Sequence, residues 1–82
     1  MNQINQKHAV LVTGASGGIG RAISLAFAAD GWSIGIHYHR NKAAAEVTLE
    51  QVAASGGTGT LYEADIRESH EVQQMVEAFC RL

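Results

Sequence analysis

The sequence predicts an α/β fold in which parallel strands alternate with helices. Three short apolar segments are each followed by a segment whose apolar residues recur at helical spacing. A glycine-rich stretch, residues 14–20, joins the first strand segment to the first helical segment. Alternation of this kind is typical of a parallel sheet whose strands are connected by crossover helices. We therefore expect the order strand, helix, strand, helix, strand, helix in one doubly wound sheet.

The first strand and the first helix flank the glycine-rich stretch. The strand is predicted over residues 8–13, because the run Ala-Val-Leu-Val within it is short, apolar and bounded by turn residues. The helix is predicted over residues 18–29, and Gly31 is positioned to end it in the left-handed conformation. The expected apolar face of this helix consists of Ile19, Ile23, Ala26 and Phe27.

The second strand is predicted over residues 32–38 and the second helix over residues 42–55, where Ser-Gly-Gly ends it. The apolar residues of that helix that recur at helical spacing are Ala45, Leu49, Val52 and Ala53. The third strand is predicted over residues 59–64, and Ser69 is the expected N-cap of the last helix. The apolar stripe of the last helix, expected to lie in a core or an interface, consists of Val72, Met75, Val76 and Phe79.

Together these elements correspond to the N-terminal half of a Rossmann-type doubly wound parallel sheet. Right-handed crossovers place the first two helices on one face of the sheet and the last helix on the other. In the complete fold the strand order 3-2-1-4-5-6 gives the first strand two neighbours, so we expect this strand to be an exposed edge here. Single α/β domains commonly run to about 200–250 residues. We therefore expect residues 1–82 to form one truncated domain, the N-terminal third of a longer protein.

Composition argues against several classes of function. The chain has 6 Lys and Arg residues, 8 Asp and Glu residues and a formal net charge of −2, without a basic patch, so nucleic acid is not an expected partner. No apolar run is long enough for a membrane span, and the polar start of the chain is unlike a signal peptide. Its single cysteine, Cys80, precludes an internal disulfide. We expect a cytoplasmic protein that does not act at a membrane.

The glycine-rich stretch predicts an anion-binding site. A strand that runs through glycines into a helix directs the unpaired N–H groups of the first turn, and the positive end of the helix dipole, at one point. The glycine spacing is G-x-x-x-G-x-G rather than the G-x-G-x-x-G of the standard dinucleotide fingerprint. The alternative interpretation is a strand-to-helix turn that binds nothing. The residues expected to contact a ligand here are Gly14, Ser16, Gly17, Gly18, Ile19 and Gly20.

Residues 13–20, Thr-Gly-Ala-Ser-Gly-Gly-Ile-Gly, resemble the cofactor loop T-G-x-x-x-G-x-G of the short-chain dehydrogenase/reductase family. Segments 11–16 and 29–40 are most similar to its 3-oxoacyl-(acyl carrier protein) reductase branch. The resemblance implies an oxidoreductase of fatty acid biosynthesis that transfers a hydride from NADPH to a ketone, and a homo-oligomeric complete protein. The run 37–40 is also similar to pteridine reductases. A nucleotide-binding module without catalysis is the remaining alternative.

The family's catalytic groups, a Ser and a Tyr-x-x-x-Lys helix, have no counterpart in this sequence. No catalytic residue is therefore assigned, and the 82-residue chain alone is predicted to be inactive. A ketone substrate concerns only the complete protein. Tyr38 and Lys42 have the Tyr-x-x-x-Lys spacing, but a strand end and a helix start share no helical face.

Arg40 is the residue expected to select the nucleotide. NAD-binding sheets carry an acidic residue about 20 residues beyond the glycine loop, where it bonds the ribose 2′-hydroxyl. At that distance this chain has Arg40, and a guanidinium binds a 2′-phosphate bidentately. His39 and the backbone at Asn41, at the start of the next helix, are expected to assist. The alternative is that Arg40 and Lys42 are solvated loop charges.

Asp65 and Ile66 directly follow the third predicted strand. In the family, an Asp followed by an aliphatic residue at this position contacts the adenine ring, so the resemblance implies that role for Asp65 and Ile66. The alternative is a carboxylate that favours the first turn of the next helix.

The remaining chemical side chains predict no further site. His37 and His39 are two residues apart, so within a strand their side chains would point the same way. Two imidazoles without a third ligand do not predict a metal centre. Cys80 has no neighbouring base in the sequence and is expected to be a packed thiol.

Overall fold

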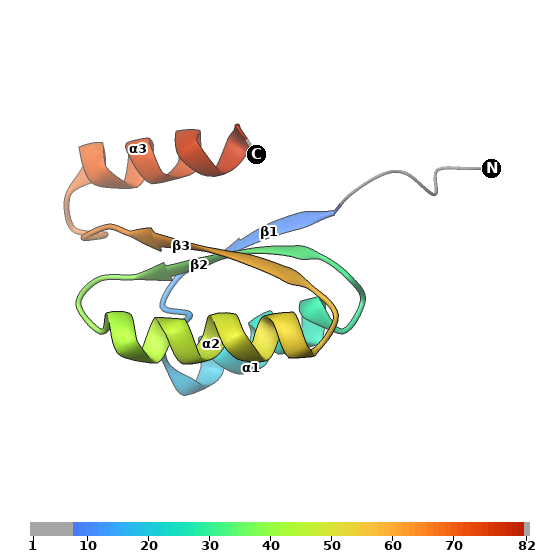
Figure 1. Cartoon of the computed structure of the whole chain (residues 1–82). Coiled ribbons are helices and arrows are strands. Elements are labelled where there is room, and N and C mark those ends of the chain that lie inside the picture. The colour runs from blue at the N-terminus through green and yellow to red at the C-terminus, as the bar shows by residue number, and fades with distance from the viewer. Residues whose placement is uncertain (1–7, 82) are drawn as a thin grey trace.

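The computed structural model of this chain describes residues 8–81, which form a three-stranded parallel sheet with helices on both faces (Figure 1). In chain order the elements are β1 (Ala9–Val12), α1 (Gly18–Ala28), β2 (Ser33–Tyr38), α2 (Lys42–Ala54), β3 (Thr58–Glu63) and α3 (Ser69–Cys80). The predicted α/β class and the predicted order of elements are therefore confirmed. Each boundary predicted for the first five elements, and the predicted start of the last helix, lies within one residue of the observed one.

The sheet order is β1-β2-β3, and both pairings are parallel. Val12 of β1 lies opposite Ile36 of β2, and Tyr38 of β2 lies opposite Glu63 of β3. The carboxyl ends of all three strands therefore meet at one edge of the sheet. Helices α1 and α2 cover one face and α3 covers the other, which agrees with the expected right-handed crossovers (Figure 1).

The core lies between the sheet and the layer formed by α1 and α2. Alternate residues of β2, namely Ile34, Ile36 and Tyr38, are at most 6% exposed and face this layer. The side chains that α2 buries against them include Ala45 and Val52. The opposite face of β2 holds Gly35 and His37.

Helix α3 packs closely on that opposite face through Phe79. A Cβ added to Gly35 would lie 2.9 Å from Cδ1 of Phe79 and 2.8 Å from Cδ1 of Leu11. Gly35 is therefore the residue that permits the close approach of α3 to the sheet. Met75 of the predicted stripe is 5% exposed, whereas Val76 is 42% exposed.

The prediction for the apolar face of α1 was wrong for Ile19, Ile23 and Ala26, whereas Phe27 is partly buried against the core. The helix buries Gly20, Ser24 and Ala28, whereas Ile19 and Ile23 are 82% and 43% exposed. The buried residues of this face are small because α1 packs too closely against the rest of the fold to accommodate larger side chains. The buried Ser24 hydroxyl donates to the Gly20 carbonyl at 2.8 Å, which satisfies it without an external partner.

Helix α3 begins differently from the prediction. Ser69 is its first helical residue, and its N-cap is Glu68, which makes no side-chain capping bond. Glu71, in the first turn, instead reaches back and accepts a hydrogen bond from the backbone N–H of Asp65 at 2.9 Å. The end of α1 follows the prediction: Gly31 has φ +81° and its N–H donates to the Ala28 carbonyl at 2.9 Å.

Within residues 8–81, no helix combines the length and the apolar character needed to cross a membrane.

Candidate functional site

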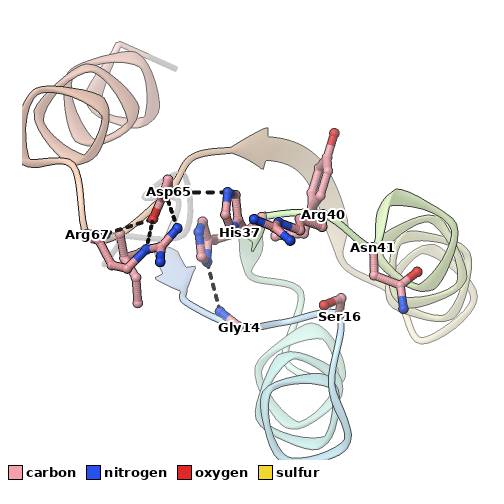
Figure 2. A pocket seen from close by; sticks show the side chains of 10 residues that line it. Gly14, Ser16, His37, Arg40, Asn41, Asp65 and Arg67 are labelled. Atoms are coloured by element: carbon pink, nitrogen blue, oxygen red, sulfur yellow. Dashed lines mark hydrogen bonds and ion pairs between the residues drawn. The ribbon is translucent and has the colours of Figure 1, made fainter.

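A cavity of about 530 Å³ opens at the edge where the strands end (Figure 2). The β1–α1 loop contributes Gly14 and Ser16 to its lining, residues 37–41 contribute the segment after β2, and residues 65–67 contribute the segment after β3. Ligands of open α/β sheets bind at this edge, because loops and helix N-termini converge there. The cavity thus unites three segments that are far apart in the sequence.

The cavity includes most of the residues predicted to bind the cofactor. Those that line it are Gly14, Ser16, His39, Arg40, Asn41, Asp65 and Ile66. The others lie along the loop and the first turn of α1 and do not line it; these are Gly17, Gly18, Ile19 and Gly20. The lining also contains His37, Tyr38 and Arg67, to which no binding role was assigned from the sequence.

Two glycines of the loop are required by its own geometry. Gly14 has φ +65°, a conformation that residues with a side chain rarely adopt, and its carbonyl accepts from the Gly17 N–H at 3.1 Å. A Cβ added to Gly20 would lie 2.4 Å from that same carbonyl oxygen and 2.8 Å from Cα of Ala15. Gly20 therefore lets the first turn of α1 lie against the loop.

Gly18 is different, because a Cβ added there meets nothing within 4 Å. Its missing side chain serves no packing purpose in this fold and leaves the start of α1 open. The N-cap, Gly17, makes no side-chain bond to the first turn, and that turn contains no acidic residue. The helix start therefore offers uncapped N–H groups and no carboxylate to repel an anion, which fits a diphosphate.

A buried polar network of side chains from α1 and α2 holds the glycine loop in place. The Thr48 hydroxyl, which is fully buried in α2, donates to the Ala15 carbonyl at 2.8 Å. Arg21 donates from Nε to Oγ1 of Thr48 at 2.9 Å and from Nη2 to the carbonyls of Ala44 at 2.9 Å and Ser16 at 3.3 Å. The sequence offered one clue to this network: Thr48 lies between Ala45 and Val52 on the buried face of α2.

His37 joins the loop to the segment after β3. The backbone N–H of Gly14 donates to Nδ1 of His37 at 2.9 Å, and Nε2 lies 2.8 Å from the Ala64 carbonyl oxygen. The ring is 3% exposed and lies between these two segments (Figure 2). The sequence signalled His37 only as one half of a histidine pair. Because β2 ends at Tyr38, His39 lies outside the strand and its side chain is 39% exposed.

Asp65 is held by Arg67. Oδ1 of Asp65 accepts from the backbone N–H and from Nε of Arg67, both at 3.0 Å, and Oδ2 accepts from Nη2 at 2.9 Å. These bonds from the side chain and the backbone of Arg67 hold the pKa of the Asp65 carboxyl well below its ordinary value. Nε2 of His39 lies 3.6 Å from Oδ2 of Asp65. The carboxylate therefore remains charged and oriented at the cavity wall.

Arg40 is exposed and lines the cavity, beside the start of α2. Asn41 is the N-cap of α2 rather than its first residue, and its Oδ1 accepts from the Ala44 N–H at 3.0 Å. The Lys42 N–H donates to the Arg40 carbonyl at 3.1 Å. The start of α2 therefore offers fewer free N–H groups to an anion than expected, because the N–H groups of Lys42 and Ala44 have partners within the chain.

Within residues 8–81, the other side chains that could take part in chemistry do not form a second site. Tyr38 is 6% exposed at the end of β2 and Lys42 is the first residue of α2, so they do not share a helix. No group of three His, Cys, Asp or Glu side chains suited to a metal is found within residues 8–81. Cys80 is exposed on α3 rather than packed, which corrects the expectation for this thiol.

The curated relatives of this chain are oxidoreductases or their homologues. It is 40% identical over 78 residues to an uncharacterized oxidoreductase of Methylorubrum extorquens, covering 95% of this chain and 31% of that protein. It is 36% identical over 78 residues to a short-chain dehydrogenase/reductase homolog of Bacillus subtilis, covering 95% of this chain and 70% of the homolog. A 3-oxoacyl-[acyl-carrier-protein] reductase of Synechocystis is 37% identical over 67 residues, which is 82% of this chain and 27% of the reductase.

Solved structures of similar fold include one with bound NADP and one of an NADH-dependent reductase. A Burkholderia cenocepacia protein with bound NADP superposes with a TM-score of 0.86 at 26% identity, over 92% of this chain and 29% of that one. An NADH-dependent reductase responsible for alginate metabolism superposes with a TM-score of 0.83 at 32% identity, over 93% and 31% of the two chains. This chain thus spans about a third of the length of most of the proteins it matches.

The short chain dehydrogenase family matches residues 8–81, which is nearly the whole chain and includes every element of the sheet and the cavity. The chain therefore belongs to the short chain dehydrogenase family.

Proposed function

We propose that this chain is the NADP(H)-binding segment of a short-chain ketoreductase. The observation that carries the proposal is the charge of the cavity. Its lining contains two guanidinium groups, Arg40 and Arg67, and a single carboxylate, Asp65, which Arg67 already pairs. A cavity with an excess of positive charge favours a nucleotide that carries an additional phosphate.

Each part of the nucleotide has a corresponding part of the cavity or of the glycine loop that borders it. The open start of α1 at Gly18 suits the diphosphate. The Arg40 guanidinium, with His39 beside it, suits the 2′-phosphate. Asp65 and Ile66 suit the adenine, since Ile66 is 59% exposed and offers an apolar surface to a ring.

The chemistry proposed for the complete protein is ketone reduction. When bound, NADPH supplies the hydride, and residues 8–81 hold its adenosine and diphosphate portions. The ketone class is proposed from the 3-oxoacyl-[acyl-carrier-protein] reductases among the relatives. The proton donor and the substrate pocket would lie outside this segment, so the 82-residue chain alone should not oxidise NADPH with a ketone.

Titration of the intact protein with NADPH and with NADH tests the proposal. We expect tighter binding of NADPH, and we expect Arg40→Ala to weaken NADPH binding by about 10- to 100-fold, the range of a lost charge-assisted bond to phosphate. NADH affinity should change little, because NADH lacks the 2′-phosphate. Lys42→Ala is the matched control, since Lys42 is a neighbouring exposed cation that does not line the cavity. An intact protein that prefers NADH would contradict the assignment of Arg40.

A nucleotide-binding module without catalysis is the second candidate. The observation that favours it is the Bacillus subtilis homolog, of which the matched segment makes up 70%, so a relative not much longer than this chain exists. NADPH oxidation by the intact protein in the presence of ketones separates the two candidates, because a module would bind NADPH without consuming it.

A further inference from the structure

We propose that His37 is a positioning residue for the cofactor site, and that it acts as a neutral imidazole with its hydrogen on Nε2. This inference rests on the proposed nucleotide function and deepens it. It concerns how the loop that suits the diphosphate and the segment that suits the adenine are held in one geometry.

The partners of the ring determine its protonation state. A backbone N–H only donates, so Nδ1 must accept the bond from Gly14 at 2.9 Å through its lone pair. A carbonyl only accepts, so Nε2 must carry the hydrogen directed at Ala64, 2.8 Å away. One neutral tautomer satisfies both partners, and it does so at a ring that is 3% exposed.

The topology explains why such a bridge is needed. Strands β1 and β3 are not neighbours in the sheet, so no ladder of backbone bonds joins the loops at their carboxyl ends. β2 lies between them, and its own backbone binds each side once: the Ala15 N–H donates to the His37 carbonyl at 3.0 Å, and the Ala64 N–H donates to the Tyr38 carbonyl at 3.1 Å. The imidazole adds a side-chain connection that reaches both loops at once.

Each partner of the ring adjoins a residue of the proposed site. Gly14 is the left-handed residue that starts the loop toward Gly18. Ala64 immediately precedes Asp65, and Ala64 is 1% exposed. A loss of the ring would therefore release the loop and Asp65 from each other, and a dinucleotide that spans both would bind less tightly.

A second proton on the ring would place an N–H against the N–H of Gly14, and it would add a charge to a buried site. Other titratable or charged groups lie on the segments next to this ring. They are His39 and Arg40 from the segment after β2, Tyr62 opposite His37 on β3, and Asp65, Arg67 and Glu71 from the β3–α3 segment and α3. Asp65 is bound by Arg67 rather than by His37, so its carboxylate does not compensate the extra charge directly.

The test combines nucleotide titration with nitrogen NMR of the intact protein. His37→Phe removes both bonds, and we expect it to weaken NADPH and NADH binding alike by about tenfold or more, the range for loss of a buried hydrogen-bond pair. His37→Asn retains an acceptor for the Gly14 N–H, and we expect it to recover part of that affinity. Val52→Ala is the stability control, because Val52 is fully buried in the core, outside the cavity lining, and its truncation lowers stability without touching the site.

NMR of ¹⁵N-labelled imidazole should show a protonated Nε2 and an unprotonated Nδ1 for His37. On acidification, NADH affinity should fall together with protonation of Nδ1, and His37→Asn should lose that coupling while His39→Gln keeps it. NADH is the probe because it carries no 2′-phosphate that titrates. Unchanged nucleotide affinity in His37→Phe, or a hydrogen found on Nδ1 at neutral pH, would overturn the inference. Equal affinities for NADH and NADPH would contradict only the Arg40 assignment, because His37 is expected to act on both nucleotides.

Discussion

The edge of the sheet where the strands begin and the edge where they end are held together by different kinds of contact. At the amino edge, Trp32 stacks on His8 with ring centroids 4.9 Å apart and packs against Phe27 at 4.7 Å. At the carboxyl edge, His37 and Asp65 take part in polar bonds around an open cavity. The amino edge therefore stabilises the fold by contacts between rings, whereas the carboxyl edge holds hydrogen-bonded polar groups around the cavity. Substitutions at the two edges should separate stability from binding.

The largest effect on stability is expected at the amino edge. Trp32→Ala removes a half-buried indole from contact with Phe27 and His8, and it should lower the free energy of unfolding by about 3 kcal/mol. The ratio of NADPH to NADH affinity should stay unchanged, because Trp32 lies at the opposite edge from the cavity. Urea denaturation measures the first quantity. Trp32→Phe, which keeps an aromatic ring, is the milder variant in which the ratio is measured.

The next largest effect on stability is expected in the glycine loop, where substitution of two glycines should change stability in opposite directions. Gly20→Ala forces a Cβ to within 2.4 Å of the Gly14 carbonyl, so we expect a loss of about 1–3 kcal/mol of stability together with a loss of nucleotide binding. Gly18→Ala meets no atom within 4 Å and should raise stability by about 0.4–1 kcal/mol.

Gly18→Ala should nevertheless weaken NADPH binding, because its methyl group would occupy the space proposed for the diphosphate. Thermal denaturation and NADPH titration of the same two variants measure both quantities. Equal NADPH affinity in Gly18→Ala and the unmodified protein would contradict the proposed diphosphate position.

The smallest effect is expected from the ion pair of Asp65 and Arg67, whose side chains are 15% and 74% exposed. Folding lowers the pKa of Asp65 from its ordinary value of 3.8, so the unfolded chain binds more protons in acid. The stabilisation should be complete above that ordinary value and should fade as the pH falls through the lowered pKa. A series of urea midpoints below neutral pH, compared between the unmodified protein and Asp65→Asn, measures the difference in slope. A steeper acid loss in Asp65→Asn would contradict the prediction.

The order of elements and the position of the cavity were predictable because they depend on local patterns. Each of these patterns spans only a few residues. Examples are the apolar run 9–12, the glycines after it and the helical spacing of residues 45–53. Arg40, Asp65 and Ile66 also follow strands directly, and parallel strands bring their carboxyl ends together without further information.

The structural features that were not predicted from the sequence depend on contacts between residues that are far apart in the chain. His37 and Gly14 are 23 residues apart, and Arg21 and Thr48 are 27 apart, so no local pattern marks them as partners. The buried face of α1 was missed for a related reason. Its packing distance is set by the glycine loop, which favours Gly20 and Ser24 over the larger Ile19 and Ile23.

The network around Arg21 also affects how an anion would approach. Its guanidinium donates to two backbone carbonyls and one hydroxyl, which are all neutral oxygens, so those bonds orient its charge without cancelling it. A guanidinium does not release its proton at physiological pH. A cation one turn from the helix start would therefore attract phosphates from a distance, and dissolved salt would weaken this attraction. The charge that these bonds orient would thus speed the first encounter with a phosphate most at low ionic strength.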